Sequence, residues 1–241
     1  MAWNGIMQPR KAITQEGVAW LSCLFILICA CLPVRADEIL LDDYKKGLSP
    51  GWIEKSFKGK TDYQVTREDG QWCIKATSRS AASALYYKIK YDIRDYPILT
   101  WRWKVDHVIA KGSALHKDGD DYGARVYVVF PSWAFWKTKA LNYIWANKLP
   151  IGQAVANPFT ANAMMIAVQS GPGLTGKWVE ETRNVLEDYR RYFGTDPSRA
   201  GAIAIMTDTD NTGEEAAAWY GPIRILSGPR RRASQCRQDH P

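Results

Sequence analysis

The sequence predicts an all-β domain, an antiparallel β-sandwich of jelly-roll-like form with one short helix. Three observations support this fold class. From Ile39 onward, apolar and polar residues alternate with a period of two, and the apolar positions are rich in aromatic and β-branched side chains. Turn-forming sequences such as Ser49-Pro50-Gly51 and Gly171-Pro172-Gly173 separate the runs. Neither an internal repeat nor a βαβ alternation is present, so a sandwich is favoured, with an up-and-down barrel as the alternative.

Eleven runs have the length and alternation of strands. They are Ile39 to Tyr44, Trp52 to Phe57, Tyr63 to Glu68, Gln71 to Thr77, Ser83 to Tyr91, Ile98 to Asp106, Tyr122 to Phe130, Lys139 to Ala146, Ala163 to Gln169, Ala202 to Thr207 and Trp219 to Leu226. One segment breaks the pattern and predicts the helix. Asn184 is suited to cap it, apolar residues then recur at helical spacing, and Gly194 ends it.

Alternation along two strands predicts which side chains share a face. Leu99, Trp101, Trp103 and Val105 point the same way, so we interpret the tryptophans as core residues. The apolar positions of the 122–130 run form a second core face in the same way. Asp121, Arg125 and Tyr127 are left on the opposite, polar face.

The first 36 residues have the layout of a cleaved signal peptide. Arg10 and Lys11 precede an apolar run from Val18 to Leu32, and Val34-Arg35-Ala36 provides small residues for cleavage after Ala36. The run is about fifteen residues long and a membrane-spanning helix needs about twenty, so we predict no permanent span. This indicates a periplasmic or secreted protein. A retained membrane anchor and a lipid anchor at Cys31 are the alternatives.

The remaining chain divides into a β-sandwich domain at residues 37–228 and a basic tail at 229–241, which we expect to be disordered. The formal net charge of +7 lies largely in the leader and the tail, leaving about +2 for the domain. That balance does not predict nucleic-acid binding. Only Cys73 and Cys236 follow the leader, so stability must come from an apolar core rather than from a disulfide framework.

The segment Asp208-Thr209-Asp210-Asn211-Thr212-Gly213 is the sharpest local motif. Asp208, Asp210 and Thr212 place oxygen donors at alternate positions, as a Ca²⁺ loop would. The twelfth position is Trp219 instead of the bidentate Glu of an EF-hand. The alternative is a turn in which Asp and Asn side chains bond to their own backbone.

Several catalytic motifs are missing or incomplete, and we predict no catalytic residue. There is no nucleophile elbow, and the glycines at 171, 173 and 176 precede a run that reads as a strand instead of the helix of a dinucleotide site. Paired carboxylates could still cleave glycosides. The candidates for that role are Asp120, Asp121, Glu180, Glu181 and Asp208.

An ordered set of motifs between Asp42 and Leu226 resembles the bacterial domain-of-unknown-function family numbered 3047. The set comprises Trp101-Arg102-Trp103, the 119–128 segment GDDYGARVYV, Gln169-Ser170-Gly171, Arg183-Asn184-Val185 and the 208–213 segment DTDNTG. The resemblance implies an exported protein and no assigned activity. The chain departs from the family pattern at Pro222, where an Asp often stands. The layout also resembles carbohydrate-binding jelly rolls, whose opening and closing strands pair.

We therefore expect a non-enzymatic cell-envelope protein that binds a carbohydrate or glycan on a polar sheet face. The expected ligand-binding residues are Arg102, Asp121, Arg125, Tyr127 and Gln169. A carbohydrate-active hydrolase and a structural or assembly factor of the envelope are the alternatives. The identity of the ligand, the occupancy of a metal site and the oligomeric state stay open.

Overall fold

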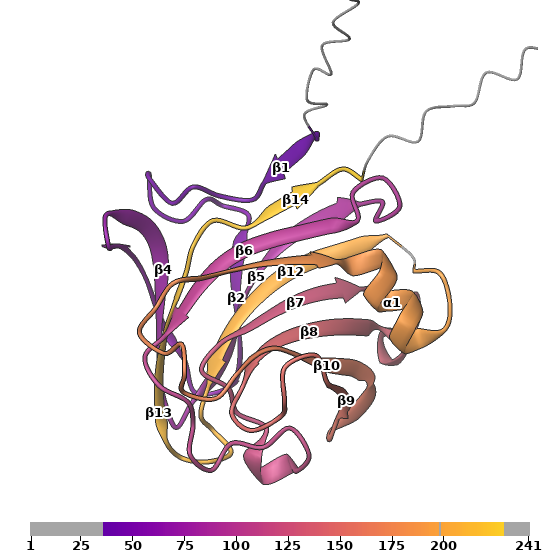
Figure 1. Cartoon of the computed structure of the whole chain (residues 1–241). Helices are drawn as coiled ribbons and strands as arrows, with labels where there is room; N and C mark the ends of the chain where they lie inside the picture. The colour runs from indigo at the N-terminus through magenta and orange to yellow at the C-terminus, as the bar shows by residue number, and fades with distance from the viewer. Residues whose placement is uncertain (1–35, 198, 229–241) are drawn as a thin grey trace, which may run out of the picture. The chain divides into compact units, whose positions relative to one another are not determined.

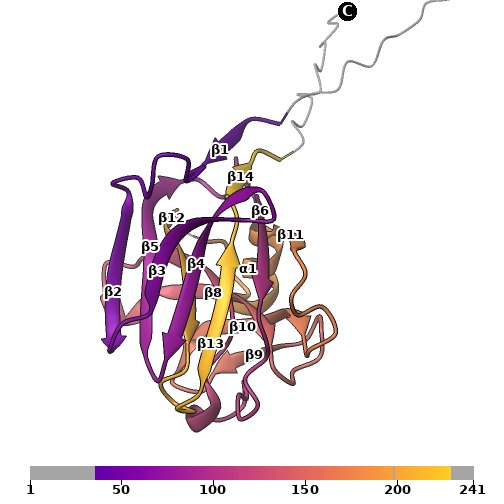
Figure 2. The same ribbon diagram turned by 90° about the vertical axis from the view of Figure 1, so that its left-hand side faces the viewer.

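The computed structural model describes residues 36–197 and 199–228, and these residues form two packed seven-stranded sheets (Figures 1 and 2). The predicted basic tail and the predicted signal peptide up to residue 35 lie outside the described residues. The all-β sandwich prediction is confirmed, and the described sheets do not close into the alternative barrel. No helix among the described residues is long and apolar enough to cross a membrane.

Sheet I carries both ends of the described chain. Its order is β1 (Glu38–Leu40), β14 (Arg224–Leu226), β6 (Ile98–Val105), β13 (Glu215–Tyr220), β4 (Gln71–Arg79) and β3 (Asp62–Glu68), with β11 (Val179–Asn184) on the other edge of β6. The opening strand β1 pairs with the closing strand β14, as the resemblance to jelly rolls suggested. In Figure 2 these two strands lie side by side beside the described ends of the chain.

Sheet II has the order β2 (Trp52–Lys58), β5 (Ala82–Tyr91), β12 (Ala200–Asp208), β7 (Arg125–Phe130), β8 (Lys139–Ala146), β10 (Thr160–Ser170) and β9 (Ala154–Asn157). Among the described strands, only β8 and β10 pair in parallel. Short 3₁₀ turns at Lys117–Gly119 (η1) and Phe135–Lys137 (η2) flank β7.

Aromatic side chains join the two sheets in the core. Trp101 and Trp103 of β6 are 1% and 0% exposed, as the alternation predicted. Their rings lie 5.3 Å from Tyr143 and 5.9 Å from Trp145, which project from β8 of the opposite sheet. These contacts hold sheet I against sheet II.

The one α-helix among the described residues closes one end of this core. Helix α1 (Val185–Phe193) begins as predicted, because the Asn184 side chain accepts a hydrogen bond from the Glu187 amide at 3.2 Å. It ends at Gly194, which adopts a left-handed φ of 67°. Tyr189 packs on Phe130 with ring centroids 4.6 Å apart, so the helix covers the end of β7 in sheet II.

Three predicted strand boundaries were wrong, two of them for identifiable reasons. The first strand stops at Leu40, because Asp42 accepts hydrogen bonds from Tyr44 N, Ser49 N and Trp52 Nε1 and so folds the following segment into a loop. The strand expected from Tyr122 begins only at Arg125. The run from Trp219 to Leu226 is split into β13 and β14 at Gly221-Pro222, since proline cannot donate to a ladder. Strand β9 was not predicted.

Replacing Trp103 with alanine should lower the free energy of unfolding by about 3–5 kcal/mol, because it removes a fully buried ring that joins the sheets. Chemical denaturation of the full chain measures this loss. Trp133→Ala is the matched control, since Trp133 is 89% exposed and its removal should change stability by about 0.5 kcal/mol or less. Equal losses in the two variants would contradict the assignment of the core.

Candidate functional site

A buried ion pair between neighbouring strands forms the centre of the site. Arg125 begins β7 and Asp208 ends β12, and the two strands pair so that Arg125 lies opposite Met206. The guanidinium bonds both carboxylate oxygens, with Nε donating to Oδ1 at 2.8 Å and Nη2 donating to Oδ2. Arg125 is 3% exposed and Asp208 is 1% exposed, so the pair is shielded from solvent.

Further contacts hold the guanidinium in place. Its Nη2 also donates to the Asp120 carbonyl, its Nη1 lies 3.7 Å from the Asp120 carboxylate, and it stacks 4.3 Å from the Tyr122 ring. Burial on its own would lower the pKa of Arg125, but Tyr127, Asp120 and other neighbouring groups raise it above the ordinary value. Arg125 is therefore a fixed positive charge.

Asp121 anchors the 208–213 loop instead of facing solvent. Its carboxylate accepts hydrogen bonds from the backbone amides of Asn211 and Thr212 at 3.1 and 2.6 Å, and from the Asn211 side chain at 3.1 Å. Gly213, with a φ of 71°, completes the turn by donating to the Thr209 carbonyl at 2.9 Å. The motif is thus a turn held by its own side chains and by Asp121.

Carboxylate oxygens of Asp121, Asp208 and Asp210 lie within 4.8 Å of one another, the grouping expected of a cation site. Two of these carboxylates already accept hydrogen bonds from the chain. Arg125 donates to both oxygens of Asp208, and backbone amides donate to Asp121. Thr212 contributes its amide to Asp121, while its hydroxyl accepts from Glu214 N at 3.4 Å. Calcium usually takes six or more free oxygen ligands, so this arrangement favours the guanidinium as the resident cation. Calcium titration tests the metal loop suggested by the sequence.

Asp210 is the most accessible acid of this group. Burial, and then the nearby charge of Asp121, raise its pKa above the usual value. Its backbone carbonyl accepts a hydrogen bond from Lys58 Nζ at 2.8 Å, which ties the loop to the edge strand β2. The carboxyl group therefore sits at the rim of the site and can accept a hydrogen bond from outside the chain.

The outward face of sheet II above this network is hollowed into a groove. The hollow over Arg125 and Asp208 has a volume of about 460 Å³ and includes Asp120, Asn142 and Asn157 in its lining. Phe57 and Phe159, which are 59% and 56% exposed, also line it. This hollow combines aromatic rings with buried polar groups.

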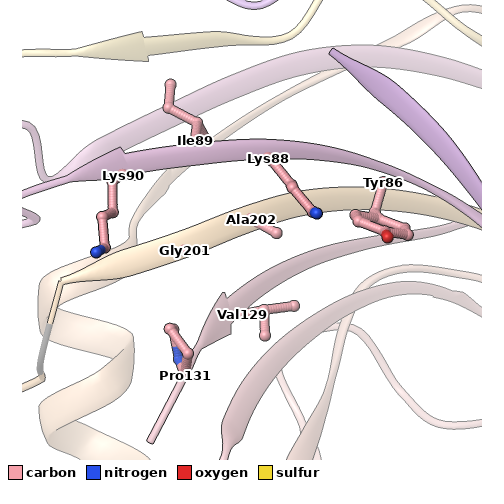
Figure 3. A pocket seen from close by; sticks show the side chains of 8 residues that line it. All are labelled: Tyr86, Lys88, Ile89, Lys90, Val129, Pro131, Gly201 and Ala202. Carbon is pink, nitrogen blue, oxygen red and sulfur yellow. The ribbon is translucent and has the colours of Figure 1, made fainter.

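The groove continues along β12 through two more hollows, of about 350 and 500 Å³. The middle hollow shares Tyr127 and Met206 with the first, and Tyr86 and Ala202 with the last. The last hollow ends at Pro131 beside β12, with Lys88 and Lys90 on one side (Figure 3). Small side chains make the floor, namely Ala82, Ala84, Ala202, Ala204 and Gly201.

Buried acceptor oxygens border the first hollow without a partner. Among the described residues, neither Asp120 Oδ1 nor Asn142 Oδ1 has a hydrogen-bond partner, although Asp120 Oδ2 accepts from Asn157 at 2.8 Å. Asp120 and Asn142 are 6% and 1% exposed. An unsatisfied buried acceptor costs about 1–3 kcal/mol. The Tyr122 hydroxyl, which also lacks a hydrogen-bond partner among the described residues, interacts with Asp120, and Tyr127 interacts with Asn142, so a ligand hydroxyl group would be a donor additional to these two.

The structure brings some predicted residues together and separates others. Arg125 and Tyr127 line the groove, and Asp121 supports its rim from below. Arg102 lies on β6 of sheet I, where it donates to Gln71 at 2.5 Å and covers Trp178. Gln169 donates to Glu181 at 2.8 Å, and neither residue lines the groove.

Other groove residues were not predicted. Asn142, Asn157, Phe57 and Phe159 were missed, although Asp120 had been noted as an acidic candidate. Phe57 stands in a predicted strand as an isolated exposed aromatic, which is a weak signal. Asn142 lies in an otherwise apolar strand, and a polar residue at such a position is a stronger signal of a functional site.

The remaining candidate groups have structural partners. Cys73 is fully buried, and burial raises the pKa of its thiol to about 11, as expected of an inert packing residue. Glu181 is bonded to Gln169, and burial raises its pKa. The 179–184 segment is strand β11, which agrees with the rejection of a dinucleotide site.

The family model described as a protein of unknown function, DUF3047, matches residues 50–224. The chain belongs to the DUF3047 family. The matched region contains every strand of sheet II and the whole Arg125–Asp208 network, so the groove lies within the part shared with the DUF3047 family model. No curated protein matches the chain significantly.

Solved structures that resemble this DUF3047 chain do so distantly. One, described as a carbohydrate-binding module of the β-sandwich superfamily, has a TM-score of 0.42 at 14% identity and covers 77% of this chain and 60% of that chain. The Emp46p carbohydrate recognition domain has a TM-score of 0.43 at 14% identity, covering 79% and 96%. The glycoside hydrolase domain of Endo-D from Streptococcus pneumoniae R6 has a TM-score of 0.38 at 13% identity, covering 75% of this chain and 22% of that chain. These likenesses are too distant to assign a ligand, and the functional argument rests on the groove.

Replacing Asp208 with asparagine should lower the free energy of unfolding by about 3–5 kcal/mol, because it removes the carboxylate that pairs with Arg125 through both oxygens and leaves the buried charge only Asp120, 3.7 Å away. The double variant Arg125→Met/Asp208→Leu should recover much of that loss. Urea denaturation checks both. In the control, Asp196→Asn breaks an exposed pair with Arg190 and should leave the midpoint unchanged. Full stability in Asp208→Asn would contradict the role of the pair.

Adding calcium should leave the thermal midpoint unchanged, because Arg125 already neutralises Asp208 and backbone amides occupy Asp121. Differential scanning calorimetry with calcium and with a chelator measures this. A saturable rise in the midpoint with calcium, absent in Asp210→Asn, would show instead that the three carboxylates hold a metal ion.

Proposed function

We propose that this protein binds a carbohydrate, without cleaving it, in the groove on the outward face of sheet II. The observation that carries the proposal is the pair of unsatisfied acceptor oxygens on Asp120 and Asn142 beside the first hollow. Sugar hydroxyl groups are donors of the kind that these oxygens lack. Both oxygens are buried, so a ligand reaches them only when the side chains that cover them move.

The aromatic residues of the groove support a sugar ligand. Phe57 and Phe159 are more than half exposed at the hollow that contains the polar network, and Tyr127 and Tyr86 continue the aromatic lining toward Pro131. Apolar ring faces combined with a few fixed polar groups are typical of small-molecule sites. Sugars match such sites because they carry C–H faces as well as hydroxyl edges.

The acidic side chains near the groove are held by hydrogen bonds and an ion pair, which supports carbohydrate binding over hydrolysis. A glycosidase needs one carboxyl group to protonate the leaving oxygen and a second, ionised one to attack or to activate water. Asp208 is held by both of its oxygens in the Arg125 pair, and Asp121 is held by backbone amides. Glu180 and Glu181 lie on β11 of sheet I, away from the groove lining.

The leader predicted at residues 1–36 supports a role outside the cytoplasm. We place the protein in the periplasm or outside the cell, where envelope or environmental polysaccharides are available. A carbohydrate of that origin is the expected ligand.

Filling the groove should abolish binding. Ala202→Trp places a large side chain between two hollows, and it should weaken carbohydrate binding at least about tenfold because the ligand and the indole would compete for the same space. Glycan-array screening finds the ligand, and calorimetric titration measures the change in affinity.

Ala217→Trp is the matched control. Ala217 is half-buried on β13 of sheet I, where an added ring meets no groove, so affinity should stay within about twofold. Thermal unfolding of both variants separates lost binding from lost folding. The proposal fails if the wild-type chain binds no envelope or plant polysaccharide, or if Ala202→Trp binds as tightly as wild type.

A further inference from the structure

A second surface feature lies on the loop between β7 and β8. Three large aromatic side chains there are exposed: Trp133 by 89%, Phe135 by 80% and Trp136 by 61%. Proteins seldom leave several large rings in water on one short segment, and such patches mark interaction sites. The groove does not account for these rings, since none of the three lines any of its hollows.

The loop is held in one conformation by its own contacts. Ala134 is 2% exposed and anchors the segment, while Lys137 N and Thr138 N donate to the Ala134 and Phe135 carbonyls at 2.8 and 3.1 Å. The Asn162 side chain bonds the Trp136 carbonyl at 2.7 Å, which ties the loop to β10. The rings are therefore presented outward by an ordered turn.

The charges around the rings are positive. Residues 131–140 contain lysines at 137 and 139 and no acidic residue, and Lys137 Nζ lies 5.8 Å from the Trp133 ring. Lys88 and Lys90 lie across the hollow that Pro131 lines, and neither forms an ion pair with a described residue. Aromatic rings beside unpaired lysines match the interfacial zone of a bilayer that carries anionic headgroups.

The geometry of the rings suits a membrane better than a sugar. Phe135 and Trp136 meet edge to face, with centroids 5.1 Å apart and planes at 83°, so they do not form the flat platform on which a sugar stacks. The hydroxyl groups of the loop are few, and the Thr138 oxygen is already bonded to Ser132 N at 3.4 Å. The headgroup region of a bilayer is fluid, so it accommodates aromatic rings in any orientation.

We propose that the 131–138 loop docks this protein on an anionic lipid surface by inserting Trp133, Phe135 and Trp136 among the headgroups. The inference is independent of the carbohydrate ligand. Docking would place the Lys88 and Lys90 end of the groove next to the membrane.

Co-sedimentation of the full chain with vesicles tests the proposal. Vesicles of phosphatidylcholine with phosphatidylglycerol should bind the wild-type chain more tightly than vesicles of phosphatidylcholine alone. The triple variant Trp133→Ala/Phe135→Ala/Trp136→Ala should lower the partition coefficient on the anionic vesicles about tenfold or more. Lys137→Gln should reduce the dependence on phosphatidylglycerol.

The control variant removes exposed apolar side chains elsewhere, Leu115→Ala/Ile151→Ala/Leu174→Ala, and should bind within about twofold of wild type. Both triple variants keep residues 1–36, so binding caused by the leader affects them equally. Similar partitioning of the two triple variants would overturn the proposal, as would a wild-type chain that does not bind anionic vesicles.

Fluorescence quenching by brominated lipids gives a second readout. Trp133→Phe/Trp136→Phe keeps apolar rings on the loop, so it should bind vesicles within about twofold of wild type but lose most of the lipid-dependent quenching. Unchanged quenching would place other tryptophans at the bilayer and overturn the assignment of the loop. Loss of carbohydrate binding in the loop triple variant, with vesicle binding retained, would assign the loop to a sugar and likewise overturn it.

Discussion

The buried pair between Arg125 and Asp208 is the constraint on which the outward face of sheet II depends. It joins the start of β7 to the end of β12 and brings Asp120 and Tyr122 against the guanidinium. A buried pair of this kind is a modest source of stability when complete and a large cost when one partner is lost. Its value to this fold is that it determines where the chain before β7 and the chain after β12 must lie.

The position of the 208–213 loop follows from that pair. With Asp208 fixed, the next residues turn back, and Asp121 holds them through two backbone amides. Asp210 is thereby brought to the rim, next to Lys58. The polar end of the groove is thus built from two acidic segments that are far apart in the sequence and linked by one guanidinium.

The rest of the groove depends on small side chains. The alanines at positions 84, 202 and 204 have short side chains, so the groove there is as deep as the strand surface. Tyr86, Tyr127 and Phe57 line it as well. Close approach also matters at the end of the groove, since a Cβ at Gly201 would lie 2.7 Å from Pro131 Cγ. A shallow apolar floor with polar groups at one end orients a ligand along β12.

Local features of this fold were predictable from the sequence. Alternation identified the buried face of β6, and the capping pattern located α1 at Asn184 and Gly194, because both depend on near neighbours in the chain. Alternation also placed Arg125 and Tyr127 on one outward face. It could not show that Asp208 would meet Arg125, since that contact depends on which strands become neighbours.

Two of the predicted site residues lie away from the groove for specific reasons. Arg102 points outward, as alternation implies, but from sheet I, and strand parity does not say to which sheet a strand belongs. At Gln169, β10 has an irregular register between Ala167 and Gln169, so the alternation of the preceding residues does not extend to it. Asn157 meets Asp120, and Asn142 lines the same hollow, only through the pairing of β8, β10 and β9, which no local pattern encodes.

The central claim is that the outward face of sheet II is the ligand surface, and methyl NMR spectroscopy of alanine-labelled protein tests it most directly. Titration with the carbohydrate that binds best should shift the methyl signals of Ala84, Ala202 and Ala204 in the groove. The signals of Ala216 and Ala218, which are buried in β13 of sheet I, should stay unchanged. Shifts confined to alanines outside the groove, at saturating carbohydrate, would contradict the account.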